Sequence, residues 1–154
     1  MKKIFWLSVI LVLIFDRTTK YLIKMTLQPQ DSIALIKDFL HITYVENTGA
    51  AFGLFTDNRW LFVVVTIFVL AILIYLAYTE ATNKKALSII LGLIAGGGAG
   101  NLIDRITEGY VLDFIDFRGL WPYVFNFADA ALVIGAVLLL ITFILNKETG
   151  ENDV

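Results

Sequence analysis

The chain contains no cysteine and only one histidine, His41, among its 154 residues. The absence of cysteine excludes disulfides, thiolate nucleophiles and cysteine-ligated metal sites. A single histidine also excludes most zinc-hydrolase arrangements. Basic residues are not in excess, because 12 Lys and Arg stand against 14 Asp and Glu. We therefore expect no nucleic-acid partner.

Charged residues make up 17% of the chain and hydrophobic residues 58%, a balance outside the usual range of soluble domains. Four apolar runs approach or reach the length that spans a bilayer. We predict helices over residues 4–26, 61–78, 86–105 and 127–145, in a single membrane domain covering residues 1–154. A cleaved signal peptide is the alternative for the first run, but Asp16-Arg17 stands where small residues of a cleavage site are expected.

The third run carries Gly92, Gly96 and Gly100 at every fourth position. Small residues at this spacing form a stripe along one side of a helix and let a neighbouring helix approach closely in lipid. The stripe therefore predicts helix packing.

Lysines cluster at the start of the chain, between the second and third runs (Lys84 and Lys85), and at the end (Lys147). Because short cytoplasmic segments retain positive charge, both termini are predicted to be cytoplasmic. Segments 27–60 and 106–126 then lie outside. The aromatic and β-branched stretch 39–45 predicts a small extracytoplasmic β-sheet there, so the fold class is a mainly α, polytopic membrane protein with four transmembrane helices and a small sheet.

Four acidic residues fall toward the outer ends of the predicted helices or in the external segment: Asp16, Asp104, Asp113 and Asp129. Ionisable groups near a membrane span are costly and are functional candidates by default. All four acids are predicted to converge on one leaflet.

Two of these acids have candidate partners in sequence. Asp16 and Lys20 are four residues apart on one helix face and can form an ion pair. Asn101, Asp104 and Arg105 share the spacing of one polar patch. We interpret Asp16, Lys20 and Asp104 as an ion-pair network that braces helices, whereas Arg105 either braces the site or binds a ligand carbonyl or phosphate.

Asp113 and Asp129 lack a basic partner in sequence. Asp129 could simply lie in a first helical turn capped by Asn126, and Asp113, like Asp116, could be a solvated loop acid. If Asp113 and Asp129 meet in a site of low dielectric constant, however, the pair holds one proton and supplies an acid and a base together. Since a helix N-terminus favours anionic Asp129, we expect Asp113 to carry the proton.

Five motifs together resemble those of the lipoprotein signal peptidases, also called signal peptidase II. They cover nearly the whole chain and occur in family order: Asp16-Arg17-Thr18-Thr19-Lys20, Asn47-Thr48-Gly49-Ala50-Ala51-Phe52-Gly53, Asn101-Leu102-Ile103-Asp104-Arg105, Gly109-Tyr110-Val111-Leu112-Asp113-Phe114 and Phe125-Asn126-Phe127-Ala128-Asp129.

The resemblance implies an aspartic endopeptidase of the bacterial cytoplasmic membrane that cleaves prolipoproteins before a diacylglyceryl-modified cysteine. It implies an extracytoplasmic β-cradle, no metal or organic cofactor, and Asp113 and Asp129 as the catalytic pair. Substrate binding or support is implied for a further set: Asn47, Gly49, Asn101, Arg105, Asn126, Asp16, Lys20 and Asp104. Lipid-modified prolipoproteins and membrane lipid are the implied partners, and a monomer suffices.

Two points of this mapping are specific to the chain. Arg17 stands where family members often carry Gln, which could alter the surroundings of Asp16. The external segment 47–53 is a candidate substrate clamp, because its glycines permit close backbone approach.

Three other functions would account for part of the sequence. A small proton-coupled transporter also uses charges in its helices, but its polar groups would be expected near the bilayer midplane. A non-catalytic assembly subunit leaves the outer acids unexplained. A serine-lysine peptidase would have to use Ser88 beside Lys84 and Lys85, at the cytoplasmic end of the third helix.

Overall fold

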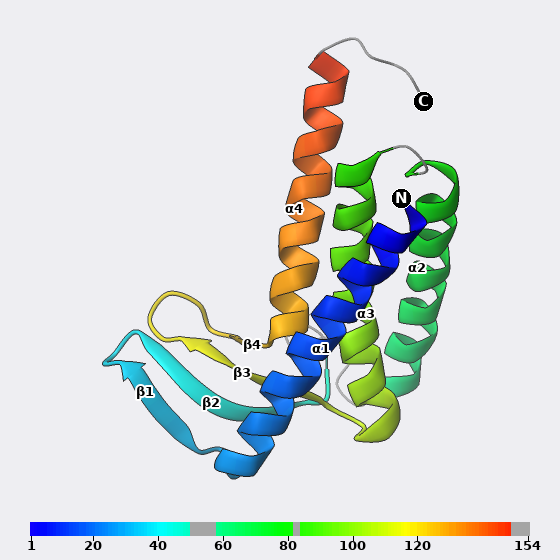
Figure 1. Cartoon of the computed structure of the whole chain (residues 1–154). Helices are drawn as coiled ribbons and strands as arrows, with labels where there is room; N and C mark the ends of the chain where they lie inside the picture. Colours follow the sequence, from blue (N-terminus) through cyan, green and yellow to red (C-terminus); the bar gives the residue numbers. More distant parts are fainter. Residues whose placement is uncertain (50–57, 82–83, 149–154) are drawn as a thin grey trace.

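The computed structural model describes residues 1–49, 58–81 and 84–148. Within these residues the chain forms four long helices and one four-stranded sheet (Figure 1). The helices are α1 (Lys2–Thr26), α2 (Arg59–Thr79), α3 (Lys85–Thr107) and α4 (Phe127–Glu148), and the strands are β1 (Ser32–Ile36), β2 (Leu40–Asn47), β3 (Val111–Phe117) and β4 (Val124–Phe125). The predicted mainly α fold with a small sheet is confirmed.

Helix α3 lies at the centre of the bundle because its glycines let α1 approach along its length. A Cβ atom added at Gly92 would lie 2.6 Å from the Cβ atom of Ser8, and one at Gly96 would lie 2.7 Å from the Cβ atom of Val12. At Gly100 the nearest atom would be an Asp16 carboxylate oxygen, at 2.8 Å. These spacings leave no room for a side chain, so the predicted close packing at the glycine stripe is confirmed.

Replacing Gly96 with alanine is expected to lower the free energy of unfolding by about 1–3 kcal/mol, because the added methyl group overlaps Val12 and forces the two helices apart. Gly98 provides the matched control: its Cβ atom would meet only Leu70 and Thr66, at 3.6 and 3.8 Å. Gly98→Ala should be neutral or slightly stabilising. Thermal unfolding in detergent measures both, and equal effects of the two substitutions would contradict the packing account.

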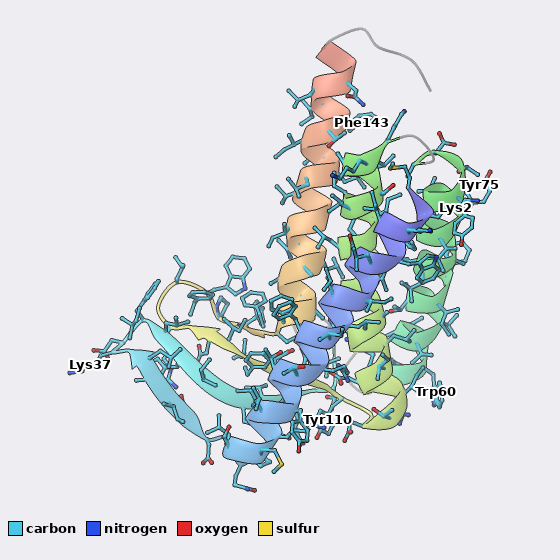
Figure 2. The ribbon with its side chains drawn as sticks, in the orientation of Figure 1. Lys2, Lys37, Trp60, Tyr75, Tyr110 and Phe143 are labelled. Carbon is cyan, nitrogen blue, oxygen red and sulfur yellow. The ribbon has the colours of Figure 1, made fainter. Side chains whose placement is uncertain are left out.

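Three of the helices described here are long and apolar enough to cross a membrane, on length and composition: α2, α3, and α4 as far as Asn146. Large side chains on α2 and α4 point away from the bundle (Figure 2), where Trp60, Tyr75 and Phe143 are 65–69% exposed. These side chains are therefore stabilised by contact with lipid and not by burial within the protein. Helix α1 is less apolar because it also carries Asp16, Arg17 and Lys20. Asp16 pairs with both cations, and each cation also pairs with Asp104 on α3.

The sheet is antiparallel, with strand order β1-β2-β3-β4, and lies at the end of the bundle opposite the N-terminus of α1 (Figure 1). Strand β3 follows α3 through Gly109, whose φ of 89° is an angle that glycine adopts readily. Strand β4 leads directly into α4. This connection brings β3 and the first turn of α4 together where the sheet meets the bundle.

Two titratable residues of this sheet are held within it. His41 lies in β2 and is buried. Asp116 is not a solvated loop acid: it lies in β3 and accepts hydrogen bonds from Thr43 Oγ1 at 2.8 Å and from Arg118 Nε at 3.1 Å. Cross-strand pairing, which the sequence does not reveal, explains the difference.

Candidate active site

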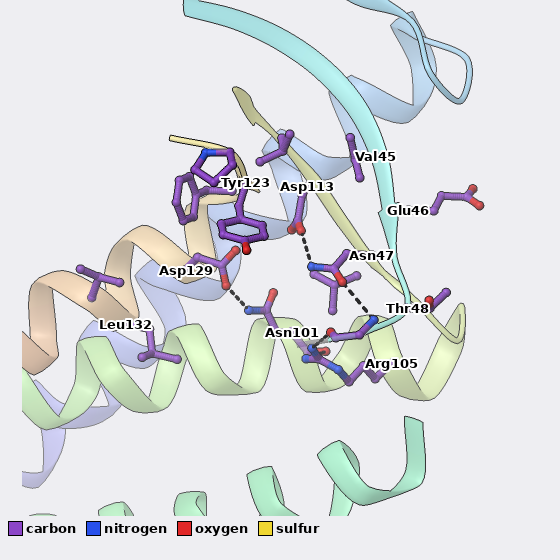
Figure 3. Close-up of a pocket in the computed structure, with 16 residues that line it drawn as sticks. Val45, Glu46, Asn47, Thr48, Asn101, Arg105, Asp113, Tyr123, Asp129 and Leu132 are labelled. Carbon is purple, nitrogen blue, oxygen red and sulfur yellow. Dashed lines mark hydrogen bonds between the residues drawn. The ribbon is translucent and has the colours of Figure 1, made fainter. Parts of the chain in front are cut away.

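A cavity of about 540 Å³ lies at the junction of the sheet and the bundle (Figure 3). Asp113 reaches it from β3 and Asp129 from the first turn of α4. The other lining residues come from β2 and the two residues after it, α3, β3, β4 and the segment before it, and α4: Val45, Glu46, Asn47, Thr48, Gly49, Asn101, Arg105, Val111, Pro122, Tyr123, Val124, Phe125, Leu132 and Val133. The structure thus brings together the two unpaired acids that the sequence singled out.

Asp113 is only 2% exposed and is held by two side-chain amides. Asn126 Nδ2 donates to its Oδ1 atom at 2.7 Å, and Asn47 Nδ2 donates to its Oδ2 atom at 2.8 Å. A solvated acid would not be fixed in this way, so the loop-acid alternative for Asp113 is wrong.

Asp129 and Asn126 cap helix α4 reciprocally. The backbone N–H of Asp129 donates to Asn126 Oδ1 at 2.9 Å, and the backbone N–H of Asn126 donates to Asp129 Oδ2 at 3.2 Å. This is the arrangement of a capping box, made here from Asn and Asp. The other oxygen, Oδ1, accepts from Asn101 Nδ2 at 2.7 Å. The predicted cap is therefore present, and Asp129 still lines the cavity.

The surroundings of Asp113 favour its protonated form. Burial, together with the negative charge of Asp129, raises the pKa of Asp113 from 3.8 to about 7, although the amide groups of Asn47 and Asn126 oppose this shift. Asp113 therefore retains a proton at pH values where an ordinary aspartate is ionised. A protonated carboxyl group and a carboxylate can act there as a pair.

The predicted brace lies directly behind this pair. Lys20 Nζ is 2.9 Å from Asp16 Oδ1 and 2.7 Å from Asp104 Oδ2, which joins α1 to α3. It also donates to Asn101 Oδ1 at 3.2 Å. The ion pair of Asp16 with Lys20 is confirmed, and Asn101 connects the brace to Asp129.

The predicted polar patch of Asn101, Asp104 and Arg105 is wrong in one respect, because its two charged members point in different directions. Asp104 faces α1, whereas Arg105 lines the cavity and donates from Nη2 to the Gly49 carbonyl oxygen at 3.3 Å. Sequence spacing placed the residues on one helix but could not assign each to a neighbouring element. Of the candidate clamp, residues 47–49 are described, and Gly49 N donates to Asn47 Oδ1 at 3.0 Å; residues 50–53 lie outside the described part of the chain.

Sequence reasoning missed the apolar wall of the cavity. Tyr123 and Phe125 line it, and the ring of Trp121 lies 6.4 Å from the first and 6.3 Å from the second. The alternation of these three aromatic residues just before Asn126 was the available signal. Leu132 and Val133 complete the wall from α4.

The comparisons with known proteins agree with this geometry. The family model described as signal peptidase (SPase) II matches residues 8–145. The lipoprotein signal peptidase of Halothermothrix orenii is 44% identical over 147 residues, which cover 95% of this chain and 99% of that protein. The lipoprotein signal peptidase of Syntrophomonas wolfei is 47% identical over 150 residues, which cover 97% and 98%.

A solved structure described as a bacterial membrane enzyme, determined by the in meso method at 2.3 Å resolution, matches with a TM-score of 0.90 at 34% identity and covers 96% of this chain and 92% of its own. A second, described in the same words at 1.9 Å resolution, has a TM-score of 0.82 at 37% identity and covers 90% and 91%. The match extends over the helices and the sheet alike, so this protein is a multi-helix membrane enzyme. The chain belongs to the signal peptidase II family, a family of aspartic peptidases.

Proposed function

We propose that this protein removes signal peptides from prolipoproteins by hydrolysing the peptide bond before a diacylglyceryl-modified cysteine, with Asp113 and Asp129 as the acid and base. The observation that carries the proposal is that both aspartates line one and the same cavity, where amide groups hold each of them in place. Membership of a peptidase family supports hydrolysis and removes the reason for considering a proton-coupled transporter.

Hydrolysis by this pair begins with water. Ionised Asp129 removes a proton from a water molecule, and the oxygen of that water adds to the carbonyl carbon of the substrate. At the same time, protonated Asp113 gives its proton to the carbonyl oxygen. The product of this step is a tetrahedral diol. Asp129 then gives the proton it took to the departing nitrogen, Asp113 recovers its own from a hydroxyl of the diol, and the C–N bond breaks. The carboxyl group of the signal peptide and the amino group of the cysteine are the products.

The supporting residues hold this geometry. Asn126 contacts both acids, through its side chain to Asp113 and through its cap to Asp129. Asn47 and Asn101 each fix one further carboxylate oxygen. Arg105 lines the cavity, where its guanidinium group donates to the carbonyl oxygens of Gly49 and Asn101, and it is placed to bind a substrate carbonyl. Rigid positioning of this kind supplies much of the rate in hydrolytic enzymes.

The position of the cavity suits a substrate anchored in lipid. Apolar residues of α4 lead from Asp129 toward the lipid-facing part of that helix, so a signal helix and acyl chains can arrive laterally while water comes from the sheet side. Lys2, Lys3, Lys84 and Lys85 lie at the opposite end of the bundle, which supports cytoplasmic termini and an active site on the extracytoplasmic face of the bacterial inner membrane. All groups invoked belong to one copy, so a monomer suffices.

Cleavage of a purified, diacylglyceryl-modified prolipoprotein tests the function. We expect one cut, immediately before the modified cysteine, identified by mass spectrometry of both products. The same prolipoprotein without the lipid is the control and should be cleaved far more slowly. A protein in folded, monodisperse form that leaves the lipid-modified substrate intact would contradict the proposal.

The pH dependence of kcat/KM should reveal the proton on Asp113. Because the pKa of Asp113 is raised to about 7, the acid is present below that pH and is lost above it. We expect kcat/KM to fall about tenfold per pH unit above the transition. Cleavage rates of the folded enzyme from pH 5 to 9 measure this, and a profile that stays flat to pH 9 would contradict the assignment of the acid.

A further inference from the structure

Arg17, whose side chain is 35% exposed, makes a set of contacts to buried groups that the proposed chemistry does not use. Its Nη2 atom lies 2.6 Å from Asp16 Oδ2, and its Nη1 atom lies 2.7 Å from Asp104 Oδ1. Nη2 also donates to the carbonyl oxygen of Gly100 at 3.0 Å. The guanidinium group thus joins α1 to α3 from the side of the cluster opposite Lys20.

The charges of this cluster balance only when Arg17 is included. Asp16 and Asp104 are buried, and each gives one carboxylate oxygen to Lys20 and the other to Arg17. Two carboxylates are then matched by two cations. Without Arg17 the single ammonium of Lys20 would face both carboxylates, and a buried excess charge is strongly unfavourable.

Two short routes lead from the cluster to the catalytic pair. In the first, Lys20 Nζ donates to Asn101 Oδ1 at 3.2 Å, and Asn101 Nδ2 donates to Asp129 Oδ1 at 2.7 Å. In the second, Asp16 Oδ1 accepts from the backbone N–H of Ala128 at 3.2 Å, next to Asp129 in the chain. Both routes end in the first turn of α4, so the charge balance around Lys20 and Asp16 affects where Asp129 lies.

Among the polar contacts that Lys20 makes within the described residues, the one to Asn101 is the longest and the only one to a neutral group. It is therefore the contact most easily lost if the two carboxylates draw the ammonium closer. Arg17 binds the second oxygen of each carboxylate and so weakens the electrostatic attraction of Asp16 and Asp104 for the Lys20 ammonium group.

We propose that Arg17 is a positioning residue for the aspartate pair: by neutralising Asp16 and Asp104 from the far side, it leaves Lys20 in place to hold Asn101 and, through it, Asp129. The proposal rests on the proposed catalytic roles of Asp113 and Asp129. Arg17 itself does not contact the cavity, so its effect should appear in kcat and not in substrate binding.

The test compares Arg17→Gln, Arg17→Lys and the wild type in the cleavage assay. We expect Arg17→Gln to lower kcat about tenfold with KM unchanged. Arg17→Lys restores the positive charge and should recover most of that loss. Arg118→Gln is the matched control, because Arg118 also pairs with an aspartate, Asp116, but within the described part of the chain its side chain bonds only to Asp116 and Ser32; it should behave as the wild type.

A second substitution distinguishes charge balance from a merely structural role. Adding Asp104→Asn to Arg17→Gln removes one carboxylate along with the cation, leaving Asp16 matched by Lys20. The double variant should have a higher kcat than Arg17→Gln alone. If Arg17→Gln alone gives no folded protein, Arg17→Lys decides: folded protein with kcat within about threefold of the wild type supports the proposal, and a larger loss contradicts it.

Two outcomes would overturn it. Wild-type kcat in folded Arg17→Gln, with only a lower melting temperature, would make Arg17 a purely structural brace. A double variant as slow as Arg17→Gln, or slower, would exclude charge balance as the cause. Both differ from failure of the proposed function, which would appear as full activity of Asp113→Asn or Asp129→Asn whatever Arg17 does.

Discussion

Asparagine in place of either Asp113 or Asp129 is expected to lower kcat by about 10²–10⁴-fold, because each carboxyl group moves a proton that an amide cannot move. Asparagine keeps the size of the side chain but only one acceptor oxygen, so each variant loses one of the two hydrogen bonds that the carboxylate accepts from its neighbours. Thermal unfolding of each variant therefore separates this loss from the effect on kcat. Single-turnover cleavage of the lipid-modified prolipoprotein measures it for both variants.

Asp116→Asn is the matched control for this experiment. Asp116 lies on the same strand as Asp113, three residues further along, but it bonds to Thr43 and Arg118 and does not line the cavity. Its replacement should leave kcat at the wild-type value. Undiminished cleavage by well-folded Asp113→Asn or Asp129→Asn would remove the acid-base mechanism.

The largest effect on stability is expected for Lys20→Met. Methionine fills a similar volume, but Asp16 and Asp104 would lose the cation that joins them from the cavity side and would remain buried with Arg17 as their only counter-charge. Removing one partner of a buried ion pair costs about 3–5 kcal/mol in other proteins. We expect a decrease of that size in the free energy of unfolding, measured by denaturation in detergent micelles.

Lys24→Met, one turn further along α1, is the control for Lys20→Met. Lys24 pairs with Glu108 at 3.2 Å, but both side chains are well exposed to solvent. Surface pairs of this kind contribute about 0–1 kcal/mol, so the control variant should unfold nearly as the wild type does. Similar losses in the two variants would show that the buried cluster is not what holds α1 to α3.

Much of the helical fold could be predicted because the bilayer restricts what a long apolar run can do. In lipid such a run must form a helix to satisfy its backbone groups, and the ends of α2 and α4 were found to within three residues. Local spacing was equally informative where both partners lie on one helix. The ion pair of Asp16 with Lys20 and the cap formed by Asn126 are of this kind.

Long-range contacts could not be predicted from spacing alone. Asn126 contacts Asp113 across a turn and a strand pairing, and nothing in the local sequence indicates which amide approaches which oxygen. The separation of Asp104 from Arg105 has the same cause, since α1 lies on one side of α3 and the sheet on the other. The role of Arg17 as the second cation of the cluster depends on the distance between two helices.

The structure also explains why the acids lie at one end of the bundle. The glycines of α3 bring α1 close enough for Arg17 and Lys20 to pair with Asp104, and the first turn of α4 begins at the same level. Strands β2 and β3 of the sheet cover this end of the bundle, and Asp113 reaches the cavity from β3. Lipid-facing helices on one side and the sheet on the other form a place where an acylated peptide and water can meet.

The central claim is that Asp113 and Asp129 hold one proton between them at neutral pH, and infrared difference spectroscopy tests it most directly. The folded enzyme should show the C=O stretch of a protonated carboxyl group at pH 6, and this band should disappear as the pH rises through about 7. The band should be missing from Asp113→Asn and unchanged in Asp116→Asn. A spectrum without a protonated carboxyl group at pH 6, from enzyme that cleaves its substrate at that pH, would contradict the account.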